Sequence, residues 1–363
     1  MLVPSVIKKP RTISKVRTLA GSGLIRIGYV PLIDAAPLLI ADSLGLFHDA
    51  GLNVRIEREL GWGSIREKIV YGELEAAHAP AGLLFSILCG LNSRPHPVST
   101  DLILNLQGNA ITLSRRFWDK GVRDAVTLRQ LLRSEAPRKP VFAVVSPISN
   151  HLHLLRNWLH AAGIDPDRHV RIVVLPPPLV GEHMKDGHID GFCVGEPWNS
   201  ASALEGEGWI IATSADLAPL HPEKILLVGD GLREQRSQEY ALLRTALLKA
   251  CKYCDTPGGR AEVVDYLHSR KLFPVTKAVL SNSLIGPFDR GTGQAPDKTP
   301  FIYFSRNEAN RATHERALWL LDNLSSSPAL TLDGAQRREC LKAVHDLPSE
   351  HAAGSSSSKS SKK

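Results

Sequence analysis

The sequence predicts an α/β fold with a largely parallel sheet, and three observations carry this prediction. Short apolar segments alternate with amphipathic segments of helical periodicity from Leu24 onward. Proline and glycine, at 24 and 28 residues, punctuate these segments as they do at turns and element ends. The 363 residues are 43% hydrophobic and 22% charged, which is typical of a globular protein and favours two domains or one large α/β domain.

The first unit reads as a strand, a helix and a second strand. These elements are expected at residues 24–30, 36–46 and 53–57. In the loop that follows, Ser64 is expected to cap a helix through Val70, because Glu67 three residues later completes a capping-box pattern.

The remaining elements divide into a second set of strands and a helical C-terminal region. Strands are expected at residues 102–106, 141–145, 171–175 and 191–194, with helices at 149–162 and 178–186 between them. From residue 232 onward the pattern predicts helices at 232–253, 260–269, 275–284, 308–323 and 334–346, and no strand.

The formal net charge of +7 lies at the two ends of the chain. Residues 1–20 carry five basic residues and residues 351–363 carry three, and neither segment has an acid. The body between them has 36 basic and 37 acidic residues. The charge balance therefore gives no support for direct nucleic-acid binding by the folded part.

The chain carries no pattern for export or for crossing a membrane. Residues 1–20 lack the apolar run of a secretory signal, and no run approaches the length of a membrane span. The odd number of cysteines, five, suits a reducing compartment. We therefore expect a cytoplasmic protein without a membrane partner.

The common catalytic signatures are absent from the sequence. There is no phosphate loop, dinucleotide fingerprint, nucleophile elbow or zinc-protease motif, so no enzyme activity and no cofactor is expected. Cys251 and Cys254 have redox or half-zinc spacing, but a second pair is missing and a structural role is favoured. His151 and His153 do not share a helix face, so no metal site is expected.

Polar residues at the ends of predicted strands are more informative, because open α/β sheets bind ligands there. These residues are Trp62, Gln107, His151, Glu196 and Lys224. Each alone also has a structural interpretation, such as a packing residue, a cap or, for Lys224, a solvated strand end. Their shared position at strand ends favours a binding site.

Six motifs in order resemble one known family. They are Ile27-Gly-Tyr-Val-Pro-Leu-Ile-Asp-Ala-Ala-Pro37, Gly61-Trp-Gly-Ser64, Gln107-Gly-Asn-Ala-Ile-Thr-Leu-Ser114, the segment 150–159, Val194-Gly-Glu-Pro-Trp-Asn199 and His221-Pro-Glu-Lys224. Over residues 24 to about 325, the chain resembles the nitrate-binding proteins of ABC-type nitrate/nitrite uptake systems. The family also has a bicarbonate-binding branch and, more distantly, sulfonate-binding proteins and pyrimidine-precursor synthases.

The resemblance implies a two-lobed periplasmic-binding-protein fold of type 2 topology, with an anion held in the cleft between lobes. The implied ligand-binding residues are Trp62, Gln107, His151, Pro177, Gly195, Glu196 and Lys224. The implied organisation is a flexible basic N-terminus at 1–22, lobe 1 at 23–104, lobe 2 at 105–225, a return to lobe 1 with C-terminal helices at 226–350, and a disordered tail at 351–363.

The chemistry of nitrate fits this residue set. Nitrate only accepts hydrogen bonds, so it needs donors, and Lys224 is expected to supply the positive charge. Glu196 cannot donate when ionised and is expected to orient His151 or Lys224. Bicarbonate carries an O–H donor, so a lysine at 224 favours nitrate or nitrite.

Uptake-type members of the family are exported, and this chain shows no export signal. We therefore expect a cytoplasmic nitrate/nitrite sensor, whose partner is an RNA-binding antitermination regulator that it sequesters and releases. Three alternatives stay open: the substrate-binding component of a nitrate/nitrite or bicarbonate uptake system, a pyrimidine-precursor enzyme using Cys193, and a binding domain acting on a transporter ATPase.

Overall fold

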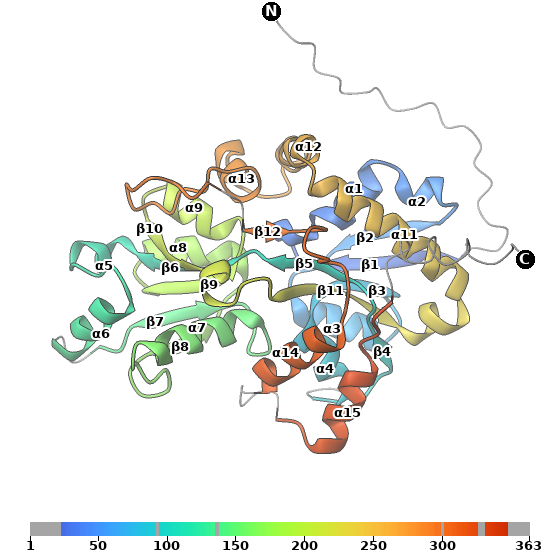
Figure 1. Cartoon of the computed structure of the whole chain (residues 1–363), viewed down its shortest axis with the longest axis horizontal. Coiled ribbons are helices and arrows are strands. Elements are labelled where there is room, and N and C mark those ends of the chain that lie inside the picture. The colour runs from blue at the N-terminus through green and yellow to red at the C-terminus, as the bar shows by residue number, and fades with distance from the viewer. Residues whose placement is uncertain (1–22, 92–93, 135–137, 299–300, 326–330, 348–363) are drawn as a thin grey trace, which may run out of the picture.

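The computed structural model describes residues 23–91, 94–134, 138–298, 301–325 and 331–347. The basic segment 1–22 and the tail 351–363 lie outside these residues, and their flexibility stays a prediction. The described chain forms two lobes, each built around one sheet, which lie side by side in Figure 1.

The first sheet contains seven strands and forms the centre of one lobe. Its order is β12 (Ile302–Tyr303), β5 (Ile103–Gln107), β11 (Pro222–Gly229), β3 (Ala76–Pro80), β1 (Ile25–Tyr29) and β2 (Val54–Arg58), with β4 (Val98–Ser99) paired to β11. The second sheet has five strands in the order β10 (Gly208–Thr213), β6 (Asn109–Ser114), β9 (Gly191–Gly195), β7 (Val141–Val144) and β8 (Arg171–Val174).

Both sheets are mixed, so the prediction of a largely parallel sheet is wrong. The β1 strand runs parallel to β2 and β3, and β7 runs parallel to β8 and β9. The β11 strand, however, is antiparallel to β3 and β5, and β6 is antiparallel to β9 and β10. The reason is topological: β11 returns from the other lobe and enters the first sheet between two strands already in place.

Helices cover both sheets, and their bounds follow in chain order. Those up to the return crossing are η1 (Ile33–Ala35), α1 (Ala36–Ser43), α2 (Leu46–Asp49), α3 (Trp62–Val70), α4 (Ala81–Leu88), α5 (Arg115–Asp119), α6 (Ala125–Ser134), α7 (Asn150–Ala161), η2 (Pro177–Leu179), α8 (Val180–Lys185), α9 (Trp198–Leu204) and α10 (Ser214–Leu217). The C-terminal ones are η3 (Gly231–Gln235), α11 (Ser237–Cys254), α12 (Pro257–Ser269), α13 (Lys277–Leu284), α14 (His314–Ser325) and α15 (Gly334–Lys342).

Two local predictions fail. The α3 helix begins at Trp62 with Gly61 as its N-cap, and the Ser64 hydroxyl donates to the Gly61 carbonyl at 2.8 Å, so Ser64 is not the cap. The short strand β12 lies where no strand was expected. It forms because its two residues extend the edge of the first sheet beside β5, with Ile302 opposite Gln107.

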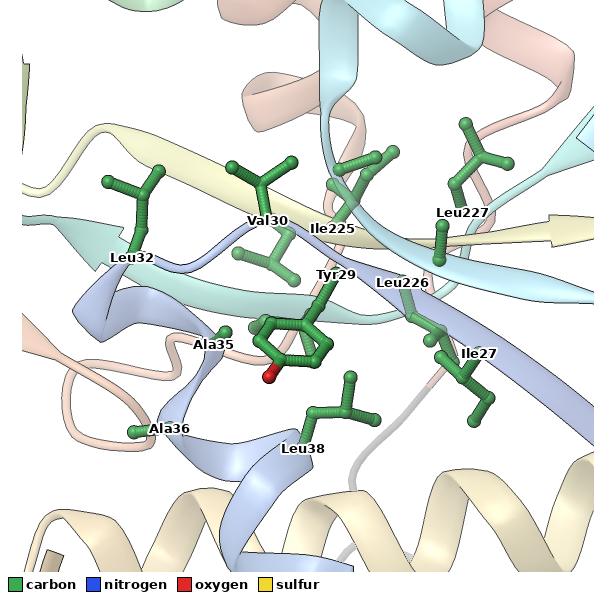
Figure 2. Packing of buried hydrophobic residues seen from close by; sticks show 14 of the residues in the cluster. Ile27, Tyr29, Val30, Leu32, Ala35, Ala36, Leu38, Ile225, Leu226 and Leu227 are labelled. Atoms are coloured by element: carbon green, nitrogen blue, oxygen red, sulfur yellow. The ribbon is translucent and has the colours of Figure 1, made fainter. Parts of the chain in front are cut away.

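The core of the first lobe is built around β1, β3 and β11. Ile27, Leu32 and Leu226 have no exposed surface, and Figure 2 shows the side chains of these segments gathered with Tyr29 and Leu38. Complete burial of one such aliphatic side chain contributes roughly 1.5–3 kcal/mol. The α11 helix packs against α1 on one side of this sheet (Figure 1).

The chain crosses between the sheets twice among the described residues. The first crossing is at Gly108, between β5 and β6, where Gln107 and Gly108 have φ values of 60° and 96°. The second lies between Thr213 and Pro222. The predicted lobe limits, 105 and 225, lie close to these crossings but stay a prediction. No helix in the described ranges is long and apolar enough to pass through a bilayer.

Candidate functional site

A group of buried polar side chains lies where the two sheets meet, and we call it the junction cluster. Its members are Asp34, His78, Asn109, His151, Glu223 and Lys224. They come from both lobes: η1, β3 and β11 on one side, β6 and α7 on the other. Their exposed fractions are between 0% and 4%. Burial of so many polar groups is costly unless they bind one another or a ligand.

Lys224 is the cationic centre of the junction cluster. It lies within β11 and is 0% exposed, so the alternative interpretation as a solvated strand end is wrong. Its ammonium lies 2.8 Å from Asp34 Oδ2 and 2.6 Å from Glu223 Oε1. Burial works to lower the pKa of Lys224, but the attraction of the two carboxylates outweighs it and raises that pKa.

The two carboxylates are held ionised by the same contacts. Burial works to raise their pKa values, but Lys224 and neighbouring histidines reverse this. The pKa of Glu223 falls to about 2, and that of Asp34 falls well below its usual range. The cluster thus contains two carboxylates and one ammonium before its histidines are counted, so Lys224 is not the free positive charge that the sequence led us to expect.

Each histidine of the cluster is fixed through one ring nitrogen. His78 Nε2 lies 2.8 Å from Asp34 Oδ1, and His151 Nε2 lies 2.8 Å from Asn109 Oδ1. The Nδ1 atoms of both rings are buried and have no hydrogen-bond partner within the described residues. Burial lowers the pKa of His151 to about 4, so its ring is neutral near pH 7.

Trp62 and Gly195 border the junction cluster. The Trp62 ring lies 5.8 Å from the His78 ring, and the Lys224 ammonium lies 5.9 Å from the indole centroid, within cation–π range. A Cβ on Gly195 would stand 3.5 Å from Asn109 Oδ1 and 3.7 Å from an Asp34 carboxylate oxygen. The structure therefore brings Trp62, His151, Gly195 and Lys224 together.

Glu196 points elsewhere. Its Oε2 accepts hydrogen bonds from the Ser283 hydroxyl at 2.8 Å and the Ser200 amide at 3.2 Å. The expected bond from Glu196 to His151 or Lys224 is thus replaced by contacts with α9 and α13. Burial raises the pKa of Glu196 to about 7. Its carbonyl accepts from the Ile33 amide at 2.9 Å and so joins the lobes beside the cluster.

Gln107 and Pro177 also have local partners. The Gln107 amide nitrogen donates to the Phe301 carbonyl and its oxygen accepts from the Leu220 amide, both at 2.6 Å. Gln107 therefore joins β5 to the loops beside it rather than presenting a free donor. Pro177 is buried at the start of η2, and its carbonyl accepts from the Val180 amide. The roles of both residues in ligand binding stay predictions.

Four members of the cluster were missed as site residues: Asp34, His78, Asn109 and Glu223. Three of them stand inside the six motifs quoted from the sequence, so their positions were visible. The overlooked signal was the neighbouring opposite charges of Glu223 and Lys224. An adjacent Glu-Lys pair at the start of an apolar strand predicts a buried ion pair. His78 lies in the unpredicted strand β3, and nothing in its surroundings marks it out.

The cysteines do not contribute to the junction cluster. Cys193 packs within the core of the second lobe, and burial raises its thiol pKa well above the usual value, which makes it a poor nucleophile. This placement weighs against the pyrimidine-precursor alternative, which relied on Cys193. Within the described ranges, no three or more His, Cys, Asp or Glu side chains form a group suited to a metal ion.

The chain is similar to known anion-transport proteins over most of its length. The model of the NMT1-like family matches residues 21–268. The chain is 35% identical over 319 residues to the nitrate import ATP-binding protein NrtC of Synechocystis sp., covering 85% of this chain and 47% of that protein. It is also 35% identical over 318 residues to the bicarbonate transport ATP-binding protein CmpC of Synechococcus elongatus, covering 86% and 47%. The chain thus spans about half the length of these relatives.

A solved structure agrees with the fold. The periplasmic nitrate-binding protein NrtA from Synechocystis PCC 6803 superposes with a TM-score of 0.82 at 25% identity, covering 89% of this chain and 86% of that one. The predicted two-lobed periplasmic-binding-protein fold is confirmed.

Proposed function

The chain belongs to the NMT1-like family, and from this premise we propose that it binds nitrate or nitrite as the substrate-binding component of an ABC-type uptake system. The observation that carries the proposal is the buried Lys224, which is held at the junction of the two lobes with the neutral ring of His151 beside it. It is not an enzyme in this proposal, because the cluster holds no activated nucleophile and Cys193 is turned into the core.

The donors around the junction cluster suit a small oxyanion. Nitrate accepts hydrogen bonds at three oxygens in one plane, and the ammonium of Lys224 and the Trp62 indole are donors of the required kind, which the His151 ring joins when its second nitrogen is protonated. The backbone at Gly195 borders the cluster, since a Cβ there would stand 3.5 Å from Asn109 Oδ1 and 3.7 Å from Asp34 Oδ2.

The size of nitrate limits its affinity. At a best-case gain of about 1.5 kcal/mol per heavy atom, its four atoms contribute about 6 kcal/mol, which corresponds to a Kd on the order of tens of micromolar. Tighter binding requires the lobes to close over charge-assisted hydrogen bonds. Since the cluster is at most 4% exposed, a ligand enters it only when the lobes separate about the two crossings.

Bicarbonate is the alternative ligand, and one observation keeps it in consideration. Asp34 and Glu223 lie within 2.8 Å of the Lys224 ammonium, so a ligand there meets acceptors as well as donors. Bicarbonate has an O–H group to donate to such an acceptor, and nitrate has none. The preference for nitrate that Lys224 suggested on its own is therefore weaker in this setting.

Calorimetric titration of the purified protein tests the proposal. Nitrate, nitrite, bicarbonate and chloride are titrated separately, with chloride as the control for general charge attraction. We expect nitrate or nitrite to bind at one site in the micromolar range and chloride not to bind. If bicarbonate alone binds, the bicarbonate alternative replaces the proposal. If none of the oxyanions binds, the function is wrong.

We propose a sensing role as a second function, and the portion of the two 35% identical relatives that matches this chain motivates it. Both are named ATP-binding proteins, and about half of each matches this chain, which contains no phosphate loop. A region similar to this chain therefore forms about half of proteins that are also named as ATP-binding. In this role the protein is cytoplasmic and reports nitrate or nitrite to a partner protein. In its most specific form, the proposal is that this partner is an RNA-binding antitermination regulator.

Co-purification from a nitrate-assimilating bacterium tests the sensing role. The bait is the full chain, washed with or without nitrate. An antitermination regulator or a transporter ATPase that is retained without nitrate and released by it supports sensing, because ligands shift partner binding only through different affinity for the two states. Retention of only a membrane permease, or export of the protein, supports uptake instead.

A further inference from the structure

The junction cluster has too little positive charge for an anion. Its only permanent cation, Lys224, is already flanked by Asp34 and Glu223 at 2.8 and 2.6 Å. All three side chains are at most 4% exposed, so water does little to screen them. A further negative charge placed among them is strongly disfavoured unless a positive charge arrives with it.

The hydrogen bonds around His151 fix which of its nitrogens is protonated. The Asn109 side-chain nitrogen donates to Glu223 Oε2 at 2.7 Å, so the Asn109 oxygen is the atom that faces His151. That oxygen is an acceptor, and His151 Nε2 must therefore carry a proton to bond to it. In the neutral ring, Nδ1 is then a bare lone pair.

A bare Nδ1 repels an anion, whereas a protonated Nδ1 donates to it. The Nδ1 atom of His151 is buried and has no partner in the described part of the chain, so it is the position where a ligand can complete the network. Glu223 Oε1 lies 3.7 Å from Nε2 of the same ring and favours its cationic form.

The other charged or titratable groups that act on His151 come from η1, β11 and the loop before β11. Asp34 on η1 favours the protonated ring, and Lys224 on β11 and His221 just before it oppose protonation. Desolvation opposes protonation most strongly in the structure as it stands. A bound anion in contact with Nδ1 adds the negative charge that reverses this balance.

We propose that the junction cluster binds a monovalent oxyanion together with one proton, which His151 accepts at Nδ1. This inference rests on the proposed function. The proton comes from solvent, a neutral imidazole becomes an imidazolium, and the anion and the new N–H form a charge-assisted hydrogen bond. The anion and the proton together add no net charge to the cluster. Neither the Lys224–Asp34 nor the Lys224–Glu223 ion pair therefore has to break.

Nitrate calorimetry measures this coupling directly. Nitrate does not take up protons itself near neutrality, so protons exchanged on binding belong to the protein. Titrations in two buffers of different ionisation enthalpy give the proton count, and we expect close to one proton taken up per nitrate at about pH 7. We also expect the Kd to rise about tenfold per pH unit between about pH 5 and about pH 7.

Two variants on the same helix locate the proton. His151→Gln keeps an amide of similar reach but cannot be protonated, so we expect weaker binding with no proton uptake and a flat pH profile. His153→Gln is the matched control, because burial also lowers the pKa of His153 to about 4 while its ring contacts Trp319 and Asn157 rather than the cluster. We expect this control to keep the wild-type proton count.

The outcomes separate this inference from the function on which it rests. Absence of nitrate binding at every pH overturns the proposed function. Binding of nitrate by the wild type with no proton uptake and a flat pH profile overturns the inference alone. Proton uptake that survives in His151→Gln but disappears in Glu196→Gln also overturns it, because Glu196 would then take the proton. If His151→Gln does not fold, the wild-type proton count still decides.

Discussion

Two buried ion pairs in this protein are built in opposite ways. The pair of Asp255 and Arg260 lies in the C-terminal region, where both side chains are 4% exposed and 2.6 Å apart. Its other partners are almost entirely backbone groups. Asp255 Oδ2 accepts from the amides of residues 304–306, and the Arg260 guanidinium donates to the carbonyls of Leu284 and Ile302.

The junction cluster instead satisfies its charges mainly with other side chains. Lys224, Asp34, Glu223, Asn109 and the two histidines bond to one another, and two Nδ1 atoms stay without partners in the described residues. A charge that binds backbone groups holds distant segments together, because a backbone amide or carbonyl cannot change partner unless the chain itself moves. A charge held by side chains can rearrange around a ligand. The contrast suggests structure in the first region and binding in the second.

The largest expected effect breaks the structural pair. Asp255→Ala leaves the Arg260 guanidinium buried without its counter-ion and three amides without their acceptor, so we expect the free energy of unfolding to fall by about 3–5 kcal/mol. Urea denaturation measures it. Asp265→Ala is the matched control, because Asp265 is exposed and paired with Lys277. We expect it to lower the free energy of unfolding by less than about 1 kcal/mol. If both variants lost the same free energy of unfolding, the Asp255–Arg260 pair would not have this structural role.

The next effect is on ligand binding. Lys224→Met removes the ammonium that faces the oxyanion, and we expect the nitrate Kd to rise at least about 100-fold, or about 2.7 kcal/mol. Calorimetry measures it, after circular dichroism has shown that the variant folds. Lys342→Met changes a lysine that is 71% exposed and should bind like the wild type. An unchanged Kd in Lys224→Met would exclude Lys224 from the site.

A pH-dependent effect distinguishes Glu196 from the ionised carboxylates. Because burial raises its pKa from 4.5 to about 7, the folded state favours protonated Glu196. This stabilisation is complete below the unfolded pKa and is lost as pH rises through the folded pKa. Relative to Glu196→Gln, the wild type should therefore lose about 2 kcal/mol of stability between about pH 5 and about pH 7. Parallel stability curves for the two proteins would show that Glu196 is ionised throughout.

The smallest effect concerns the hydrogen bond that supports Glu196. Ser283→Ala removes the hydroxyl that donates to its Oε2, and we expect a loss of about 1 kcal/mol of stability. Without this donor the ionised form is less well solvated, so the pH at which the Glu196 contribution disappears should also move upward. Thermal unfolding followed at several pH values measures both, and an unchanged profile would argue against this contact.

Much of the fold was predictable because its helices and buried strands have strong periodicity. The α7 and α12 helices lie close to their predicted ranges, since apolar residues recur at helical spacing, and Thr256 caps the start of α12. The strand β12 was not predictable, because two residues carry no period and only the edge of β5 makes them a strand. The direction of β11 was hidden for a similar reason, since it depends on the path of the chain through the other lobe.

The candidate site was predictable in position and less so in electrostatics. Lys224, His151 and Trp62 were chosen because they stand at strand ends, and the structure places them around one cluster. Of the two carboxylates that neutralise Lys224, Glu223 is its neighbour in sequence, whereas Asp34 lies 190 residues away. The Glu223–Lys224 pair was visible in the local sequence, but local patterns contain no information about the contact of Asp34 with Lys224, and so the net charge of the site could not be inferred.

The most direct test of the central claim is a crystal structure of the protein grown with nitrate. We predict one nitrate enclosed between the two sheets, within hydrogen-bond distance of the Lys224 ammonium and of His151 Nδ1. A junction cluster that keeps its present contacts, with nitrate absent or bound only to arginines on the surface, would contradict it.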